Sequence, residues 1–163
     1  MRIWILILTI LMPLAAFAQG AGVSLGGFAY DSSQPVEITA DSLDVDQSSG
    51  TATFQGNVVI GQSEMRLSAQ SVVVEYSDNA EGQSAIDRLL ASGGVTLVGP
   101  DEAAEASSAV YDVQGGFVEL SGNVLVTQGP AALSGDTLRI NLETGSGTLQ
   151  GNVRTILNTG GDQ

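Results

Sequence analysis

The side chains that could do chemistry in this sequence are almost all carboxylates. The chain of 163 residues carries 18 Asp and Glu residues and five arginines, and it has no lysine, histidine or cysteine. Two carboxylates that face each other could act as a glycosidase pair. Most of the acids, however, stand in loops or at alternate positions of predicted strands, which is typical of a solvated face. The sequence therefore predicts no catalytic residue and no enzyme.

The missing residue types exclude several further kinds of site. A chain without His or Cys has no zinc site of the usual nitrogen and sulfur ligands, no cysteine nucleophile and no histidine-based triad. A formal charge of −13 argues against binding to nucleic-acid phosphates, which needs clustered Lys and Arg. We therefore expect no metal site, no cofactor and no nucleic-acid partner.

The first residues are typical of an export signal. Arg2 precedes an apolar stretch of roughly 12–15 residues, which is shorter than the roughly 20 residues of a membrane-spanning helix. Small residues suitable for cleavage follow at Ala16 and Ala18. We therefore predict a signal peptide over residues 1–18, cleaved after Ala18, and a location in the bacterial periplasm. The alternative is that this stretch remains as a membrane anchor.

The rest of the chain is expected to form one domain with short extensions. Residues 19–34 are rich in Gly and Ser and predict a flexible lead-in. Residues 158–163 predict a frayed tail. The domain itself is expected over residues 35–157, a length that fits a single core.

Two sequence markers recur within this domain. Gly-Asn or Gly-Gly followed by Val begins at Gly56, Gly93, Gly122 and Gly151. A small residue followed by alternating apolar residues begins at Ala40, Ala69, Ala106 and Gly135. Successive markers lie 29 residues apart, except for one interval of 37 in each series. This predicts repeated units of 29 residues, with one insertion of eight residues in the polar sequence SDNAEGQSAID.

Each unit has the period-two alternation of β-strands. Only Asp101–Ala109 has helical propensity, and its place in the repeat predicts a strand there too. Gly-Asn favours positive φ at both residues, as in tight turns between antiparallel strands. Each unit therefore supplies about four short strands, and four units supply about 16.

This pattern predicts an all-β fold: a twisted β-jellyroll or β-solenoid of about 16 short antiparallel strands, open at both ends. Open ends expose strand edges, which readily pair with another chain. The residues expected on the inward face are Val36, Ile38, Leu43, Val45, Phe54, Val58, Ile60, Leu67, Val72, Val74, Leu97, Val118, Leu120, Val124, Val126, Leu138 and Ile140. These side chains form either a dry core or, because small residues leave space between two sheets, a groove.

The order of these motifs also resembles a known family. Residues 35–76, from PVEITADSL through TFQGNVVI to SVVVEY, resemble the OstA-like domain of the LptA family of lipopolysaccharide-transport proteins. Residues 104–142 continue the resemblance, which covers about 35–157 in all. The order and spacing of these motifs together are strong evidence for the resemblance.

The resemblance implies a periplasmic protein that binds lipopolysaccharide through the acyl chains of lipid A. It implies that the chain stacks end to end in a bridge, with LptC at the N-terminal edge and LptD at the C-terminal edge. The groove would be lined by Val36, Ile38, Leu43, Val45, Phe54, Val58, Ile60, Val72, Val74, Leu97, Val118, Leu120, Val124 and Leu138. The alternatives are an LptC-like, membrane-anchored member of the same system and a structural β-repeat filament protein with a dry core.

Overall fold

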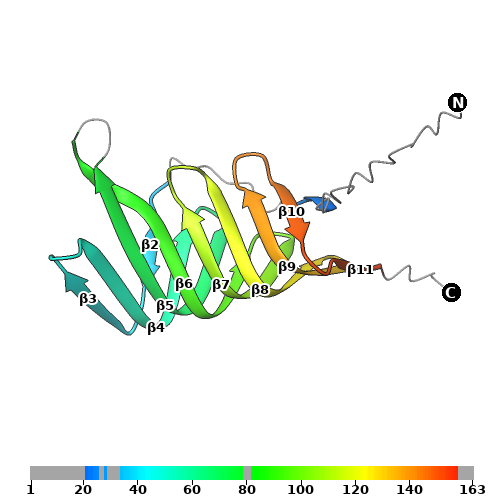
Figure 1. Cartoon of the computed structure of the whole chain (residues 1–163), viewed down its shortest axis with the longest axis horizontal. Coiled ribbons are helices and arrows are strands. Elements are labelled where there is room, and N and C mark those ends of the chain that lie inside the picture. Colours follow the sequence, from blue (N-terminus) through cyan, green and yellow to red (C-terminus); the bar gives the residue numbers. More distant parts are fainter. Residues whose placement is uncertain (1–20, 26–27, 29–33, 79–81, 158–163) are drawn as a thin grey trace, which may run out of the picture.

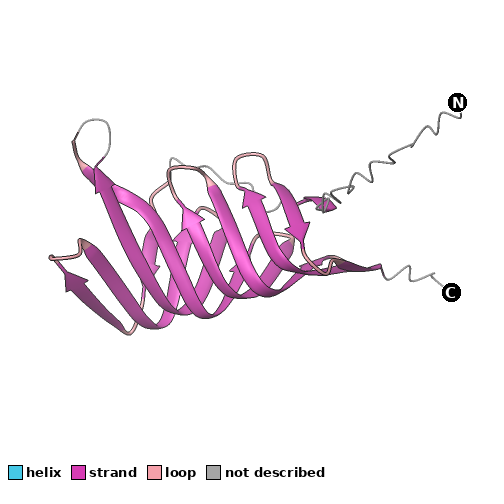
Figure 2. Cartoon of the chain, viewed as in Figure 1, coloured by secondary structure: helices cyan, strands magenta, loops and turns pink. Residues whose placement is uncertain are grey.

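The computed structural model describes residues 21–25, 28, 34–78 and 82–157. The predicted signal peptide at residues 1–18 and the predicted tail at 158–163 lie outside the described residues. Figure 2 shows that the described residues are mainly strands joined by turns and loops. None of the described residues belongs to a helix long and apolar enough to cross a membrane.

In the described part of the chain, eleven antiparallel strands form one sheet (Figure 1). The strands are β1 (Ala21–Ser24), β2 (Glu37–Thr39), β3 (Ser42–Asp46), β4 (Thr51–Gln62), β5 (Met65–Asp78), β6 (Ser84–Val98), β7 (Glu102–Asp112), β8 (Phe117–Gln128), β9 (Ala131–Asn141), β10 (Ser146–Gln150) and β11 (Arg154–Leu157). Strands β4 to β9 pair in chain order. At the N-terminal end β4 pairs with both β2 and β3, and at the C-terminal end β9 pairs with both β10 and β11.

The Gly-Asn and Gly-Gly markers are corners inside or between these strands. Gly56 and Asn57 have φ angles of 79° and 47°, and Gly93 and Gly94 have φ angles of 85° and 87°. The pairing register of β4 with β5 shifts at the first corner, and that of β6 with β7 shifts at the second. The positive φ angles were predicted correctly, but the chain does not reverse here. It bends and continues as the same strand, as a β-bulge allows.

The two sequence markers meet at these corners. The side chain after each small residue packs against the glycine of the next corner: Asp41 on Gly56, Gln70 on Gly93, Ser107 on Gly122 and Asp136 on Gly151. Asn57 donates a hydrogen bond to Asp41 (2.8 Å), and Asn152 donates one to Asp136 (2.8 Å). Three of these pairs of markers, Ala40 and Gly56, Ala106 and Gly122, and Gly135 and Gly151, are each 16 residues apart, which is the chain length that brings one marker back to the other.

The corners fold the single sheet into two leaves. The first leaf contains β1 and residues 42–55, 71–92, 108–121 and 137–150; the second contains residues 37–39, 58–69, 95–106, 124–135 and 154–157. In Figure 1 the long strands descend from a row of turns at the top and bend near the lower edge. We call the side opposite the corners the open side, and the space between the leaves the interior.

The fold class is confirmed, with fewer and longer strands than expected. Strands β4 to β9 each contain 11 to 15 residues, because each runs through its corner from one leaf to the other. Counting every bent strand as two brings the number close to the predicted 16. The segment with helical propensity is strand β7. The inserted residues lengthen the hairpin of β5 and β6, which rises beyond the other turns in Figure 1.

Residues 19–34 were predicted to be a flexible lead-in. This prediction is wrong for residues 21–25 and 28, which the structure describes. Ala21–Ser24 form β1, which pairs with β10 in a regular antiparallel register. Leu25 and Phe28 are fully buried. Gly and Ser suggested a linker, but Leu25 and Phe28 give this segment apolar anchors that a solvated linker lacks.

Candidate functional site

The interior is lined by continuous apolar rows that run across the sheet. Directly paired residues of an antiparallel sheet lie on the same face, so the register defines each row. One row of the first leaf is Leu43, Phe54, Val72, Ala91, Ala109, Leu120, Leu138 and Leu149. A row of the second leaf is Ile38, Ile60, Leu67, Leu97, Ala104, Val126 and Leu133. An apolar wall therefore extends through every long strand of both leaves.

Most of the residues predicted to line the groove lie together on these walls. Those that are buried are Val58, Ile60, Val72, Val74, Leu97, Val118, Leu120, Val124 and Leu138. Val36, Ile38 and Phe54 are partly buried and pack against the same cluster. Leu67, Val126 and Ile140, also expected on the inward face, are buried as well.

Leu43 and Val45 are a correction to the predicted inward core. Their pairing with Phe54 and Ala52 places them on the interior face, but they are 54% and 61% exposed. The reason is their position on β3, which ends the first leaf and pairs only with β4 among the described strands. The alternation predicted the face of the sheet correctly, but it contains no information about how far the opposite leaf extends.

Several interior residues were not predicted. Met65, Leu89, Tyr111, Leu142 and Leu149 are buried in the same cluster. Leu142 continues the alternation of Leu138 and Ile140, so the sequence did contain its signal. Leu89 is followed by Leu90, and this pair of apolar residues obscures which one points inward. Leu25 and Phe28 carried no periodic signal.

Polar side chains close the open side of the interior. The Tyr111 hydroxyl of the first leaf donates a short hydrogen bond to Gln62 Oε1 of the second leaf. Gln62 Nε2 in turn donates to the carbonyl oxygen of Gln34 (2.8 Å). Further along the second leaf, Gln128 Nε2 donates to Glu102 Oε1 (2.8 Å). We call the contact between Tyr111 and Gln62 the clasp, because it joins the free sides of the two leaves.

Three arginines of the described sheet contact groups of the protein itself. Arg88 pairs with Glu75 (2.8 Å), its direct neighbour on the adjacent strand. Arg139 contacts Glu119 (3.3 Å) and lies 3.6 Å from the centre of the Phe117 ring. Arg66 donates to the carbonyl oxygens of Ser63 and Met65. These cations stabilise the outer surface and are not gathered into one anion-binding cluster.

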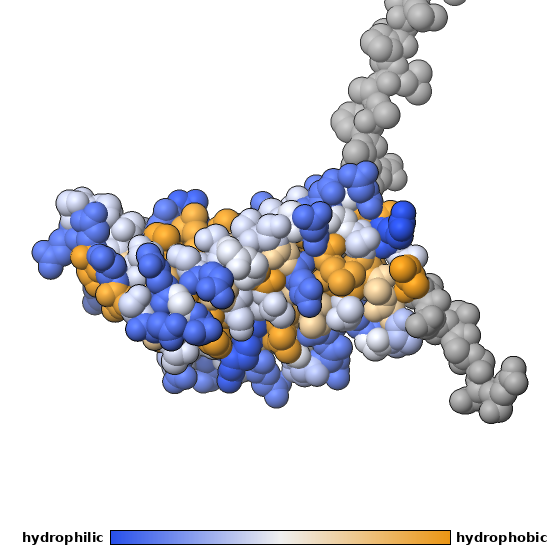
Figure 3. Space-filling model, turned by 90° about the horizontal axis from the view of Figure 1, so that it is seen from below, coloured by the Kyte–Doolittle hydropathy of each residue, from blue (hydrophilic) through white to orange (hydrophobic). Residues whose placement is uncertain are grey.

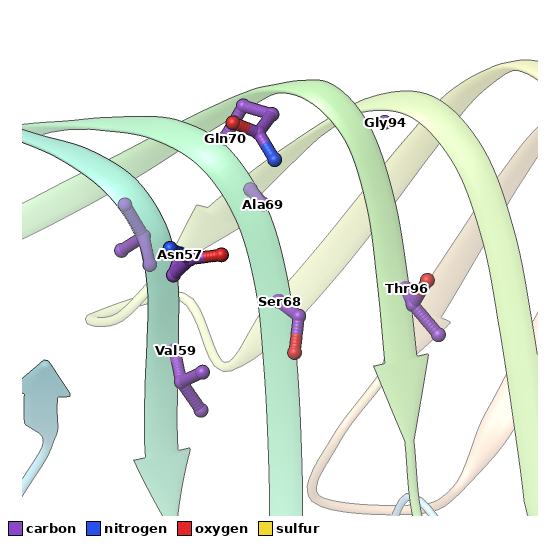
Figure 4. Close-up of a pocket in the computed structure, with 8 residues that line it drawn as sticks. Asn57, Val59, Ser68, Ala69, Gln70, Gly94 and Thr96 are labelled. Atoms are coloured by element: carbon purple, nitrogen blue, oxygen red, sulfur yellow. The ribbon is translucent and has the colours of Figure 1, made fainter. Parts of the chain in front are cut away.

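Recesses on the surface of the described residues also lie outside the interior. The recess in Figure 4, of about 280 Å³, is lined by Val59, Ser68 and Thr96, which occupy the outward row of the second leaf. A second recess, of about 450 Å³, lies beside the exposed Val45 and Tyr76 at the N-terminal end. It includes Asp46, whose carboxylate accepts hydrogen bonds from the side chain and backbone of Ser48; these bonds lower the pKa of Asp46.

The two ends of the sheet differ in charge. The N-terminal end carries the exposed acids Glu37, Asp41, Asp44 and Asp46. At the C-terminal end, the only charged residue of strands β10 and β11 is Arg154. Hydrophobic surface reaches both ends in the view of Figure 3. Within the described ranges, no group of three or more Asp and Glu side chains is arranged to hold a metal ion.

Comparisons with known proteins agree with this architecture. LptH from Pseudomonas aeruginosa, described as the LptA-homologous periplasmic component of the lipopolysaccharide transport device, superposes with a TM-score of 0.68. The superposition covers 78% of this chain and 98% of LptH, at 18% sequence identity, so it supports the fold.

The amino-acid sequence is also similar to those of lipopolysaccharide-transport proteins. Lipopolysaccharide export system protein LptA of Escherichia coli K12 is 26% identical over 139 residues, which cover 80% of this chain and 72% of that protein. An uncharacterized protein of Rhizobium meliloti is 27% identical over 144 residues, or 85% and 77% of the two chains. The pattern that defines the LptA/(LptD N-terminal domain) LPS transport proteins matches residues 37–146. With its bent strands, apolar interior and paired ends, this chain therefore belongs to the family of LptA/(LptD N-terminal domain) LPS transport proteins.

Proposed function

We propose that this chain binds lipopolysaccharide through the acyl chains of lipid A and carries it along its interior as part of a periplasmic bridge. The observation that supports this most directly is the apolar wall, which crosses all the long strands and is exposed at the N-terminal end through Leu43 and Val45. Because the chain belongs to a family of LPS transport proteins, lipopolysaccharide is the expected cargo. The chain acts as a transport protein and not as an enzyme.

The interior lowers the barrier to moving a lipid through water. Each CH₂ group that leaves an apolar environment costs about 0.8 kcal/mol, so exposing ten of them costs about 8 kcal/mol. The interior side chains are close-packed in the structure, so an acyl chain enters when the leaves separate along the open side. The clasp must then break, while the corners act as the hinge.

The head group of the cargo stays at the open side, in contact with solvent. Arg66, Arg88 and Arg139 already contact protein groups, so they form no ready-made phosphate cradle. The acidic surface is compatible with divalent cations that bridge a lipid phosphate and a carboxylate. Recognition therefore rests mainly on the acyl chains.

The ends of the sheet provide the contacts of the bridge. Strands β2 and β3 form the N-terminal edge, which would receive LptC or a preceding copy. The C-terminal end, with β11, would receive LptD or a following copy. An exposed strand edge binds another chain by completing the backbone hydrogen-bond ladder. Deletion of residues 153–163 should therefore impair stacking and docking, and normal oligomerisation of that variant would contradict this arrangement.

Photocrosslinking at neighbouring positions tests the proposed interior site. A photoreactive residue in place of Val58, which is buried on the interior face, should form adducts with lipopolysaccharide. The same residue in place of Val59, which faces the outer recess, should not. Equal crosslinking at both positions, or none at Val58, would count against binding in the interior. Mass spectrometry of lipids extracted from the purified protein provides an independent measurement, since a dry core carries none.

A second experiment tests the location and role in the cell. Depletion of the protein should make lipopolysaccharide accumulate at the inner membrane. Sequencing of the N-terminus of the periplasmic form should begin near Gln19 if the signal peptide is cleaved. Retention of residues 1–18 would favour the membrane-anchored, LptC-like alternative.

A further inference from the structure

Residues 21–25 and Phe28, the described part of the segment before Gln34, occupy the C-terminal end of the interior. Val23 of β1 pairs with Gly147, which extends an interior row of the first leaf by one strand. Two residues later, Leu25 is fully buried, and so is Phe28. Both belong to the same apolar cluster as the walls of the proposed lipid site. These side chains therefore fill space that the proposed function gives to acyl chains.

The first leaf leaves room for this segment through its glycines. A Cβ atom on Gly147 would lie 2.8 Å from Leu25 Cδ1, so only glycine allows Leu25 to approach β10 this closely. The Leu25 amide donates to the carbonyl oxygen of Gly145 (2.7 Å). The segment is thus seated in a fitted position on the wall and is not lying loosely over it.

The segment also reaches towards the second leaf. Gln128, at the end of β8 in the second leaf, donates from Nε2 to the carbonyl oxygen of Ser24 (3.4 Å). Ser24 itself pairs with Ser146 on the first leaf. The segment therefore connects the two leaves at the C-terminal end, as the clasp does elsewhere.

At the C-terminal end of the sheet, β1 makes the first leaf extend further than the second leaf. Strands β10 and β11 both pair with β9, so without β1 the two leaves would end at the same strand. The N-terminal end is level in this way, since β2 and β3 both pair with β4. With β1 in place, the first leaf is longer by one strand, about 4.8 Å. A level N-terminal end of a second copy cannot pair with both leaves of this uneven end at once.

On these grounds, and resting on the proposed function, we propose that the described residues of this segment, 21–25 and Phe28, form a displaceable plug. In its seated position it fills the C-terminal end of the interior and extends the first leaf. Its release opens that end to an acyl chain and leaves β10 and β11 level for pairing with a second copy. The segment precedes the region matched by the family pattern, which begins at residue 37.

A disulfide lock provides a direct test, because the chain contains no cysteine of its own. The pair Ser24→Cys and Ser146→Cys joins directly opposed positions of β1 and β10. With purified lipopolysaccharide as the probe, the oxidised variant should bind at least several-fold less than its reduced form, and it should remain monomeric. Equal binding and equal self-association in the two redox states would overturn the plug.

A second lock serves as the matched control. The pair Asp44→Cys and Thr53→Cys joins β3 to β4 on the outward face at the opposite end of the same leaf. Its lipopolysaccharide binding should not depend on redox state. If the unmodified protein binds no lipopolysaccharide at all, the proposed function fails along with the plug. If it binds and the first lock has no effect, only the plug fails.

Substitution of Phe28, a buried residue of the plug, should have the opposite effect to the disulfide lock and increase lipopolysaccharide binding. Phe28→Ala weakens the seated state, so lipopolysaccharide binding should increase several-fold and self-association should begin at lower protein concentration. Leu149→Ala is the control, because it removes a buried side chain from the wall of β10 instead of from the plug. A purely structural role for Phe28 predicts that both variants lose stability and that neither gains binding, which would refute the proposal.

Discussion

Glycine at the corners has two separate roles at the residue scale. Gly93 and Gly94 both adopt positive φ angles, which disfavour any residue with a Cβ atom. Only Gly93 is also in close contact, since a Cβ atom there would lie 2.6 Å from Gln70 Cβ. Around Gly94 there is open space within 4 Å. Substitutions at these two neighbouring positions can therefore distinguish the cost of backbone strain from the cost of steric contact.

We expect Gly94→Ala to lower the free energy of unfolding by about 1 kcal/mol, from the left-handed backbone alone. Gly93→Ala should lower it by about 2–4 kcal/mol, because the Gln70 backbone and Cβ must also shift. Urea unfolding monitored by circular dichroism measures both values. Equal losses in the two variants would show that the contact with Gln70 is unimportant.

In the proposed function, the clasp links stability to lipid access. Tyr111→Phe removes the hydroxyl that binds Gln62 and leaves a buried amide oxygen without this donor, at a cost of about 1–3 kcal/mol. Because the clasp must break for the leaves to separate, the same variant should take up lipopolysaccharide faster. Stopped-flow binding with a fluorescent lipopolysaccharide measures this rate. Tyr76→Phe, at a tyrosine that is 45% exposed, should change neither quantity; a slower uptake by Tyr111→Phe would contradict the gating role.

At the scale of the elements, position within a row decides what an apolar residue does. Leu43 and Val72 belong to the same interior row, but Leu43 is 54% exposed on the terminal strand and Val72 is 1% exposed. Leu43→Asp should change the free energy of unfolding by less than about 0.5 kcal/mol. Val72→Asp should lower it by more than about 4 kcal/mol, because it buries a carboxylate in an apolar wall.

The same pair of variants tests the function of the terminal strand. If the end of the row accepts cargo or a partner, Leu43→Asp should reduce lipopolysaccharide crosslinking and end-to-end association while the protein stays folded. Crosslinking yield and light scattering on the purified variant measure the two effects. A fully active Leu43→Asp variant would show that the exposed end of the row has no part in transport.

The strands themselves were largely predictable from the sequence, for a physical reason. Alternation of apolar and polar residues encodes the face of a strand, and the regular distance from each small-residue marker to the next corner glycine encodes their contact. What alternation does not encode is whether the chain reverses or bends at Gly-Asn, because both need positive φ angles. Leu43 and Val45 show the same limit, since their burial depends on the length of the opposite leaf. Leu25 and Phe28 form too short a segment to have a period at all.

The whole molecule carries a strong negative charge that opposes self-association. Its formal charge is −13, and four exposed acids lie at or near the N-terminal edge. Raising the salt concentration from about 0.01 M to about 0.1 M shortens the Debye length from about 30 Å to about 10 Å. We therefore expect end-to-end association to strengthen over this range, as measured by analytical ultracentrifugation.

Asp44→Asn provides the control for this charge effect, because the residue is exposed on β3 at the N-terminal end. The variant should associate more strongly at low salt and respond less to added salt. Association that weakens as salt is added would instead show that attraction between opposite charges holds the copies together.

The bent-strand repeat also sets the length of the interior in fixed steps. Each 29-residue unit adds two strands to the sheet, and neighbouring strands lie about 4.8 Å apart, so the interior lengthens in steps of about 10 Å. A step adds the same corner and the same apolar rows, and it leaves the strands at both ends unchanged. Evolution or design can therefore change the span of one protomer by duplicating or removing a unit, without rebuilding the surfaces that meet its neighbours. If protomers stack as proposed, a gap of fixed width can be matched in coarse steps by the number of protomers and in finer steps by the number of units in each.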